Sequence, residues 1–299
     1  MGEGAIAEIH MEALASTCAQ VTHLVPGETE TGARFASKHQ ISSICNLDEL
    51  LASDVDGVIV ATPSDLHATH AQALANRGIP SLVEIPMATR LEDAEALAIL
   101  HAPLMIAHTR RFSPAHRAMK ARIESGETLQ HLVAQTYFMR RENRNMMGKP
   151  RTWVDSLIWH HAVHSVDLFL WLTGDTTPDI AALAGPPHPE MGCVMDLAVV
   201  LRSRAGTLMT LACSFNNDGP FGGFYRYVCE GGTWHVFRDE LTDAGGASVA
   251  TEGAGGFVSQ DQTFLDGIAG HSEFEPTPTT ALPAMQIVEK IARITDALF

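Results

Sequence analysis

Short apolar runs alternate with helical segments over the first hundred residues, and this alternation constrains the fold more than any other feature. The pattern predicts strands at 21–25, 57–61, 81–84 and 104–107, with helices at 64–76 and 90–101 between them. Strands that alternate with helices in this order pair in parallel and carry the helices on their faces. The alternation of apolar runs and helical segments ends near residue 108, so we predict an α/β domain over residues 1–108.

Residues 109–299 follow a different pattern, which predicts a second domain. Helices are expected at 113–125 and 156–172, and strands at 129–137, 195–201, 207–215 and 225–237. Strands that follow one another directly favour a mainly antiparallel sheet, so this is an α+β domain. The Gly- and Ala-rich segment 243–256 is expected to be a mobile loop. The last helix, about 284–298, closes the fold and could pack back on the first domain.

The chain begins with Gly2-Glu3-Gly4-Ala5-Ile6-Ala7, which fits the pattern G-x-G-x-x-A. A helical pattern follows directly, and a strand follows the helix, as the motif requires. Such glycines permit a tight turn and let a cofactor pyrophosphate approach the N–H groups of a helix N-terminus. We therefore predict a Rossmann dinucleotide-binding domain with NADP or NAD as cofactor, contacted by Gly2, Gly4, Ala5 and Ile6.

Two features of this domain depart from the usual dinucleotide fold. A buried central strand normally precedes the glycines, and its absence would leave backbone groups unpaired at about 1–3 kcal/mol each. Our hypothesis is that the natural product carries an upstream apolar strand before Met1. An acidic residue after the second strand favours NAD, and a basic one favours NADP. Glu28 lies in this region but equally suits a solvated helix start, so the choice of cofactor stays open.

Charge and composition exclude several classes of function. A net charge of -15 argues against nucleic acid as a partner, because phosphate binding requires a basic surface. No run of apolar residues approaches eighteen, and the start lacks a secretory signal pattern, so we expect a cytoplasmic protein without a membrane segment. The five cysteines form no C-x-x-C pair, which argues against a disulfide framework and a structural zinc site.

Motifs in both domains resemble those of the Gfo/Idh/MocA family of nicotinamide-dependent oxidoreductases, over nearly the whole chain. They are Thr62-Pro63, His67, Glu84-Ile85-Pro86 and His160-x-x-x-His164-x-x-Asp167. The resemblance implies cofactor contacts on the nicotinamide side for Thr62, Pro63, His67, Glu84, Ile85 and Pro86. It also implies a homodimer or a higher homo-oligomer.

Four stretches are similar to one subgroup of that family: 83–86, 108–112, 159–164 and 214–220. The subgroup acts in aromatic compound catabolism and oxidises a carboxylated cyclic hemiacetal to a pyrone dicarboxylate. Most members of the wider family carry Lys in place of Ile85 and Asp in place of His160. Because the subgroup shares both departures, they argue against assignment as a sugar or inositol dehydrogenase more strongly than they argue against an enzyme. That alternative stays open, as does a non-catalytic regulator that binds the dinucleotide.

Three histidines on one predicted helix are the candidate catalytic residues. Oxidation of a hemiacetal requires a base near its hydroxyl, and histidine titrates close to neutral pH. The resemblance makes His164 the first choice, with His160 as orienting partner or alternate base and His161 as third candidate. On an α-helix His160, His164 and Asp167 would share one face. The spacing of His160 and His164 also suits zinc, but no H-E-x-x-H motif is present, and no metal is predicted.

Arginines concentrate in two segments of this acidic chain, and arginine pairs bidentately with carboxylates. We therefore predict a small carboxylated substrate. The residues expected to bind it are Arg110, Arg111, Arg141, Arg151, Trp153 and Asn217, the last through its match to the subgroup. For Arg140, Arg144 and Lys149, surface ion pairs are an equally good interpretation.

Overall fold

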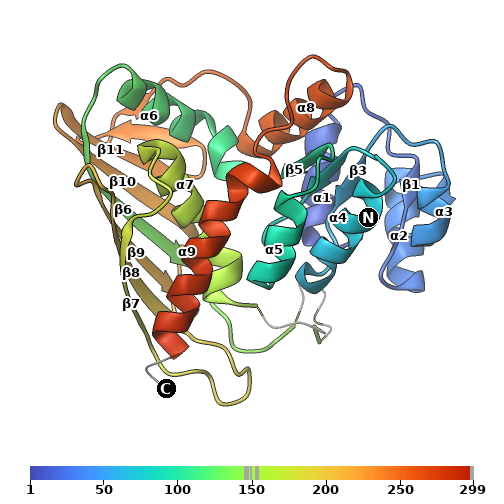
Figure 1. Ribbon diagram of the computed structural model, residues 1–299, viewed down its shortest axis with the longest axis horizontal. Helices are drawn as coiled ribbons and strands as arrows, with labels where there is room; N and C mark the ends of the chain where they lie inside the picture. The colour runs from blue at the N-terminus through green and yellow to red at the C-terminus, as the bar shows by residue number, and fades with distance from the viewer. Residues whose placement is uncertain (145–147, 149, 152–154, 297–299) are drawn as a thin grey trace. The chain divides into compact units, whose positions relative to one another are not determined.

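The computed structural model describes residues 1–144, 148, 150–151 and 155–296 (Figure 1). The chain forms two compact units, which we call the first unit (1–108 with 257–282) and the second unit (109–256 with 283–299). The segment 257–282 therefore returns to the first unit, whereas the sequence assigned all of 109–299 to the second domain. The residues from 283 onward, including most of the last helix, group with the second unit.

The first unit is built on short parallel strands. Three of them pair in the order β3 (Val58–Val60), β4 (Ser81–Val83) and β5 (Leu104–Ile106), and β1 (His23–Leu24) pairs with β2 (Ser43–Ile44). Strands β4 and β5 are buried at every residue, as expected for a parallel sheet covered on both faces. The backbone of Met1 and Gly2 bonds on one side to Val25 and on the other to Ile59 and Ala61.

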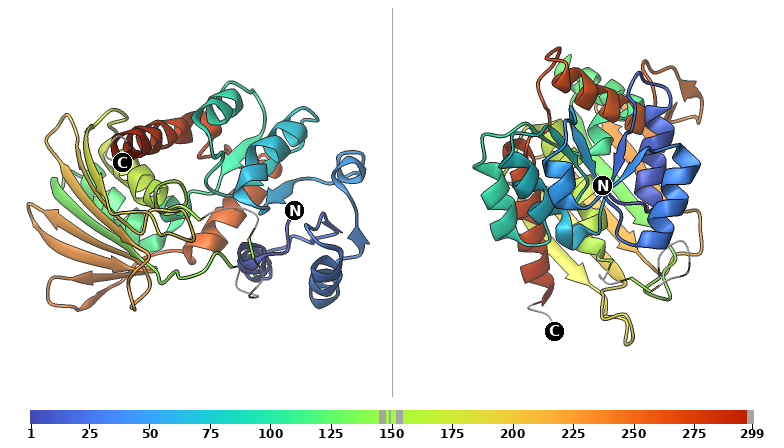
Figure 2. Two further views of the ribbon diagram at one scale, coloured as in Figure 1. Left: turned by 90° about the horizontal axis from the view of Figure 1, so that it is seen from below. Right: turned by 90° about the vertical axis from the view of Figure 1, so that its right-hand side faces the viewer.

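Helices alternate with these strands, as the sequence predicted for 64–76 and 90–101, whereas the helices at 29–39 and 47–51 were not predicted (Figure 2). They are α1 (Ala5–Leu14), α2 (Thr29–His39), α3 (Leu47–Leu51), the 3₁₀ turn η1 (Ser64–Leu66), α4 (His67–Ala75) and α5 (Leu91–Ala98). Helix α8 (Gly256–Ile268) belongs to this unit from residue 257 onward and was not predicted.

The second unit contains an eight-stranded sheet in the order β13-β12-β11-β10-β6-β9-β8-β7. Its strands are β6 (Leu129–Tyr137), β7 (Asp179–Ala184), β8 (Asp196–Arg202), β9 (Leu208–Ser214), β10 (Gly222–Cys229), β11 (Gly232–Phe237), β12 (Glu240–Asp243) and β13 (Ser248–Val249). All neighbours are antiparallel except β6 and β9, which run parallel. The predicted strand at 225–237 is a hairpin of two strands, and the predicted loop at 243–256 includes β13.

Helices cover one face of this sheet (Figure 1). They are α6 (Pro114–Glu124) and α7 (Val163–Thr173), preceded by the 3₁₀ turn η2 (Thr109–Phe112) and by the π-helix η3 (Leu157–Ala162). The chain ends in α9 (Pro278–Asp296), which begins six residues before the predicted helix. Strand β8 alternates buried and exposed residues, so Leu197, Val199 and Leu201 lie on its buried face. No helix among the described residues has the length and apolar character needed to cross a membrane.

Candidate active site

The glycine-rich turn has the geometry that a dinucleotide requires. Gly2 has a φ of +90°, and a Cβ there would lie 2.3 Å from the backbone oxygen of Ala61, so only glycine fits. Gly4 is the N-cap of α1, and a Cβ there would meet no atom within 4 Å. Ala5 is exposed and Ile6 is half-buried beside it. The N-terminus of α1 is therefore open backbone that fits a cofactor pyrophosphate.

His67 connects the ends of two neighbouring strands. Its Nδ1 lies 2.8 Å from the carbonyl oxygen of Pro86, and its Nε2 lies 2.8 Å from that of Thr62. The ring is only 2% exposed, and Pro63 and Ile85 are half-buried next to these contacts. His67 thus fixes both strand-end turns relative to each other, and this contact gives it a positioning role in the region expected to receive the nicotinamide.

Glu84 belongs to a buried triad that the sequence did not reveal. His10 on α1 places Nε2 3.0 Å from Glu84 Oε1 and Nδ1 2.8 Å from Asp261 Oδ2 on α8. The second oxygen of Glu84 accepts from the backbone N–H of Ile85 at 3.2 Å. Burial of His10 lowers its pKa, but the hydrogen bonds and charges of Asp261 and Glu84 outweigh burial and raise the pKa to about 9. We therefore assign Glu84 to this ion-paired network.

The histidine segment of the second unit is not the continuous α-helix that the sequence predicts. Residues 157–162 form a π-helix, and α7 starts only at Val163. A π-helix bonds residue i to residue i+5 and turns more slowly than an α-helix, so the segment that carries the histidines is locally wider than the α-helix that the sequence predicts. Among the described residues, no three potential ligand side chains converge as in a metal centre.

Each of the three histidines has a different setting. Nδ1 of His160 accepts from the backbone N–H of Ser156 at 3.0 Å, so in the neutral ring Nε2 carries the proton. His161 lies with Nε2 3.1 Å from Asp155 Oδ1 and packs against the rings of Phe138 and Phe215. His164 is half-buried in the first turn of α7.

Asp155 is a buried carboxylate at which two arginines and His161 meet. Arg140 lies 2.7 Å and Arg151 3.0 Å from the same oxygen, Oδ2. Burial raises the pKa of Asp155, but the hydrogen bond from His161 and the positive charges of His161 and Arg140 hold the pKa well below its usual range. Sequence reasoning missed Asp155, although its position directly before the Ser156 cap and the histidines was a usable signal.

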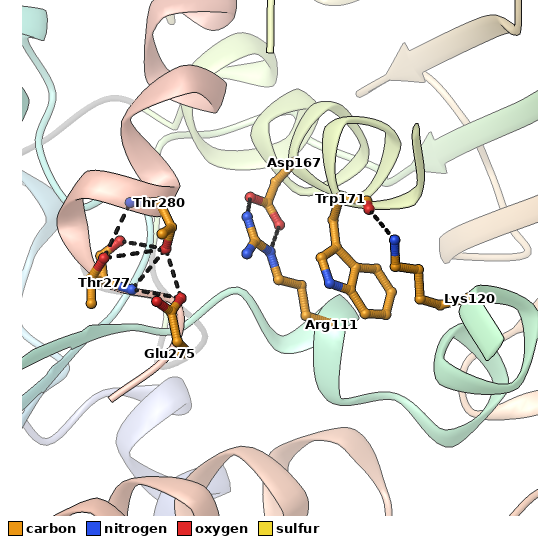
Figure 3. Close-up of polar contacts among 7 residues, drawn as sticks. All are labelled: Arg111, Lys120, Asp167, Trp171, Glu275, Thr277 and Thr280. Carbon is orange, nitrogen blue, oxygen red and sulfur yellow. Dashed lines mark hydrogen bonds and ion pairs between the residues drawn. The ribbon is translucent and has the colours of Figure 1, made fainter. Parts of the chain in front are cut away.

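Two other predicted substrate residues are engaged by the protein itself. Arg111 donates to both oxygens of Asp167 at 2.8 and 2.6 Å, which ties η2 to α7 (Figure 3). Arg141 donates to the carbonyl oxygens of Arg140 and Phe215 and to Asn216 Oδ1. Both therefore hold the fold together in this structure.

Two further candidates, Arg144 and Asn217, bond to residues close to them in the sequence. Arg144 pairs with Glu142 and donates to the carbonyl oxygen of Gly148. Asn217 is exposed and bonds to the carbonyl oxygen of Pro220 within its own turn. Lys149 and Trp153 lie outside the described residues.

Arg110 differs from these arginines. Its guanidinium lies 5.7 Å from the centre of the Tyr225 ring, and in the described part of the chain its buried Nε meets no hydrogen-bond acceptor. A Cβ at residue 223 would come within 3.0 Å of the guanidinium, so Gly223 leaves room for it. No carboxylate within the described residues forms an ion pair with Arg110.

Neutral groups surround this arginine. Nδ1 of the buried His116 lies 2.6 Å from the hydroxyl of Tyr227, and Ser165 Oγ lies 3.2 Å from the hydroxyl of Tyr225. Burial, aided by the charge of Arg110, lowers the pKa of His116 well below its usual value, and burial raises that of Tyr227 well above. Both are therefore uncharged near pH 7, and they leave the charge of Arg110 uncompensated.

Comparison with known proteins assigns both units. A family model described as "Oxidoreductase family, NAD-binding Rossmann fold" matches residues 1–102, and one described as "Bacterial oxidoreductases, C-terminal" matches residues 114–253. The chain is 42% identical over 248 residues to 4-carboxy-2-hydroxymuconate-6-semialdehyde dehydrogenase of Sphingobium sp., covering 80% of this chain and 78% of that protein.

More distant relatives have the same fold. Inositol 2-dehydrogenase 4 of Saccharopolyspora erythraea is 28% identical over 70% of this chain and 62% of its own. The WlbA dehydrogenase of Bordetella pertussis, solved with NADH and UDP-GlcNAcA, superimposes with a TM-score of 0.84 at 19% identity, covering all of this chain and 95% of that one. The glycine turn, the strand-end motifs and these matches agree, and the chain belongs to the Gfo/Idh/MocA family as an NAD(P)-dependent dehydrogenase.

Proposed function

We propose that the protein oxidises the cyclic hemiacetal of a carboxylated semialdehyde, of the 4-carboxy-2-hydroxymuconate-6-semialdehyde type, to a pyrone dicarboxylate. Two findings support this substrate class: the 42% identity to a dehydrogenase of that name, and the Arg110 guanidinium, which pairs with no carboxylate in the part of the chain that the structure describes. The second observation carries the proposal. Burying a cation among neutral groups costs free energy, and an anionic group on a ligand would offset that cost.

Arg110 is therefore the proposed anchor for a substrate carboxylate. Its position on Tyr225 and above Gly223 restricts the orientation of the guanidinium, which favours a planar, bidentate partner. Neutral sugars and inositols offer hydroxyls and no charge, so they would leave Arg110 uncompensated. This difference separates the proposal from the inositol dehydrogenase alternative suggested by the more distant relatives.

The chemistry requires a hydride and a proton to leave the same C–OH group. The hemiacetal carbon gives its hydrogen as hydride to the oxidised nicotinamide, the hydroxyl gives its proton to a base, and the C–O bond becomes the carbonyl of the pyrone. We assign the base to His164. His160, whose Nδ1 is held by the backbone of Ser156, presents a donor at Nε2 and suits an orienting role.

The test measures the absorbance of the reduced nicotinamide formed with two substrates, 4-carboxy-2-hydroxymuconate-6-semialdehyde (below, the dicarboxylate substrate) and myo-inositol. Each substrate is assayed with NAD and with NADP. Turnover of the dicarboxylate alone is the expected result. Turnover of inositol at a comparable kcat/KM would overturn the substrate class and leave the dehydrogenase assignment in place.

We also propose that the protein is a homo-oligomer that associates through the sheet face opposite α6 and α7. Leu183 is 66% and Val200 41% exposed on that face, and Leu208 is exposed on the neighbouring strand. Light scattering coupled to size exclusion tests this, and a monomer at micromolar concentration would contradict it.

A further inference from the structure

A carboxylate from the glycine turn caps the helix that follows β1. Oε2 of Glu3 accepts from the backbone N–H of Gly27 at 2.8 Å, and Oε1 accepts from that of Glu28 at 3.0 Å and from Thr31 Oγ1 at 2.9 Å. The N-cap of α2 is Glu28, whose own side chain makes no capping bond. Glu3 therefore performs from about 25 residues away the role that an N-cap side chain usually performs.

This carboxylate lies in the region where dinucleotide folds read the adenosine ribose. In such folds an acidic residue at the end of the second strand bonds to the 2′-hydroxyl, or a basic residue nearby accommodates a 2′-phosphate. Val25 follows β1 here, and its carbonyl oxygen accepts from the N–H of Gly2 at 2.9 Å. The strand end thus supplies no acid of its own, and the glycine turn bonded to it supplies Glu3.

The basic side chains of α2 do not compensate the charge of Glu3. Arg34 lies 3.8 Å from Glu30, and Lys38 and His39 both pair with Glu8. A phosphate at the loop between β1 and α2 would meet a carboxylate, and the two N–H groups and the hydroxyl that suit a phosphate already bond to Glu3. A hydroxyl, in contrast, can donate to a carboxylate oxygen, because each oxygen accepts more than one bond.

We propose that Glu3 is the residue that selects NAD over NADP, by accepting the ribose 2′-hydroxyl and repelling a 2′-phosphate. The inference rests on the family assignment and is independent of the substrate. The proposed residue, Glu3, lies within the G-x-G turn, whereas the sequence alone pointed to Glu28 as the acid near the ribose.

The experiment is fluorescence titration of the full-length protein with NADH and with NADPH, without substrate. The wild type is expected to bind NADH more tightly, and Glu3→Gln to raise relative NADPH affinity about tenfold or more, chiefly through the Kd of NADPH. Glu3→Gln keeps one acceptor oxygen for the loop and removes the charge. The ratio of two Kd values measured on one variant is unaffected by an inactive fraction, so partial misfolding cannot imitate the result.

Two exposed acids of the same unit serve as comparisons. Asp48→Asn on α3 is the control, because it removes one negative charge without releasing Arg34 from Glu30, and it should leave the NADH to NADPH ratio unchanged. Glu28→Gln tests the competing residue. The proposal is overturned if the wild type binds NADPH as tightly as NADH, if Glu3→Gln leaves the ratio unchanged, or if Glu28→Gln shifts it as much.

Discussion

His10 and Asp261 are 251 residues apart in the sequence, yet His10 Nδ1 and Asp261 Oδ2 are 2.8 Å apart in the interior of the first unit. Glu84 bonds to the other ring nitrogen, so one imidazolium lies between two carboxylates. This network joins α1, which starts at the glycine turn, to the end of β4 and to the late helix α8. A long-range ion pair therefore supports the cofactor-binding unit.

The raised pKa of His10 predicts a pH dependence of stability. A pKa that rises from 6.5 to about 9 on folding adds roughly 3 kcal/mol below pH 6.5, which is lost as the pH rises from about 6.5 to 9. His10→Gln should lower the urea midpoint most near pH 6 and progressively less towards pH 9. His39→Gln, which removes a partner of Glu8 whose side chain is 15% exposed, is the control. Equal losses at pH 6 and pH 9 would contradict this account.

The buried pair of Arg111 and Asp167 predicts a large loss of stability when it is broken. Asp167 is fully buried, so Asp167→Asn leaves an uncompensated guanidinium and should cost about 3–5 kcal/mol in the free energy of unfolding. The exposed pair of Arg202 and Asp179 provides a matched control, and Asp179→Asn should cost about 0–1 kcal/mol. Chemical denaturation measures both, and similar losses would refute the distinction.

If His164 is the base, His164→Ala should lower turnover by about 10²–10⁴ and leave the affinity for the reduced cofactor nearly unchanged. His161→Ala removes the ring that lies on Asp155, and its main effect should be on stability. Steady-state kinetics and cofactor titration on both variants separate the two roles. Normal turnover of the His164 variant would remove that residue from the mechanism.

Arg110→Gln should raise the KM of the dicarboxylate about 10- to 100-fold, because a charge-assisted hydrogen bond is lost. A substrate esterified at the recognised carboxylate should be used equally by the wild type and the variant. Arg141→Gln is the control, since Arg141 bonds to loop carbonyl oxygens and should leave this KM unchanged. An unaltered KM in Arg110→Gln would exclude it as the anchor.

Much of the architecture was predictable because its signals are local. Residues adjacent in sequence produce the glycine turn, the strand ends at Thr62 and Glu84, and the alternation in β6 and β8. The structure contains the corresponding strands. Strand β7 was not predicted, because its alanines and single leucine give weak periodicity. The segment 157–162 was predicted as part of an α-helix, because no local sequence pattern distinguishes a π-helix from an α-helix.

The sequence by itself determined the fold class, the dinucleotide turn and the concentration of arginines, because each depends on the type and spacing of residues along the chain. Only the tertiary structure decided which of the clustered arginines pair with carboxylates among the described residues and which do not. Arg111 finds Asp167, and Arg140 and Arg151 find Asp155, whereas Arg110 lies among neutral rings and hydroxyls. Charge compensation depends on distances between residues remote in sequence, and folding alone sets those distances.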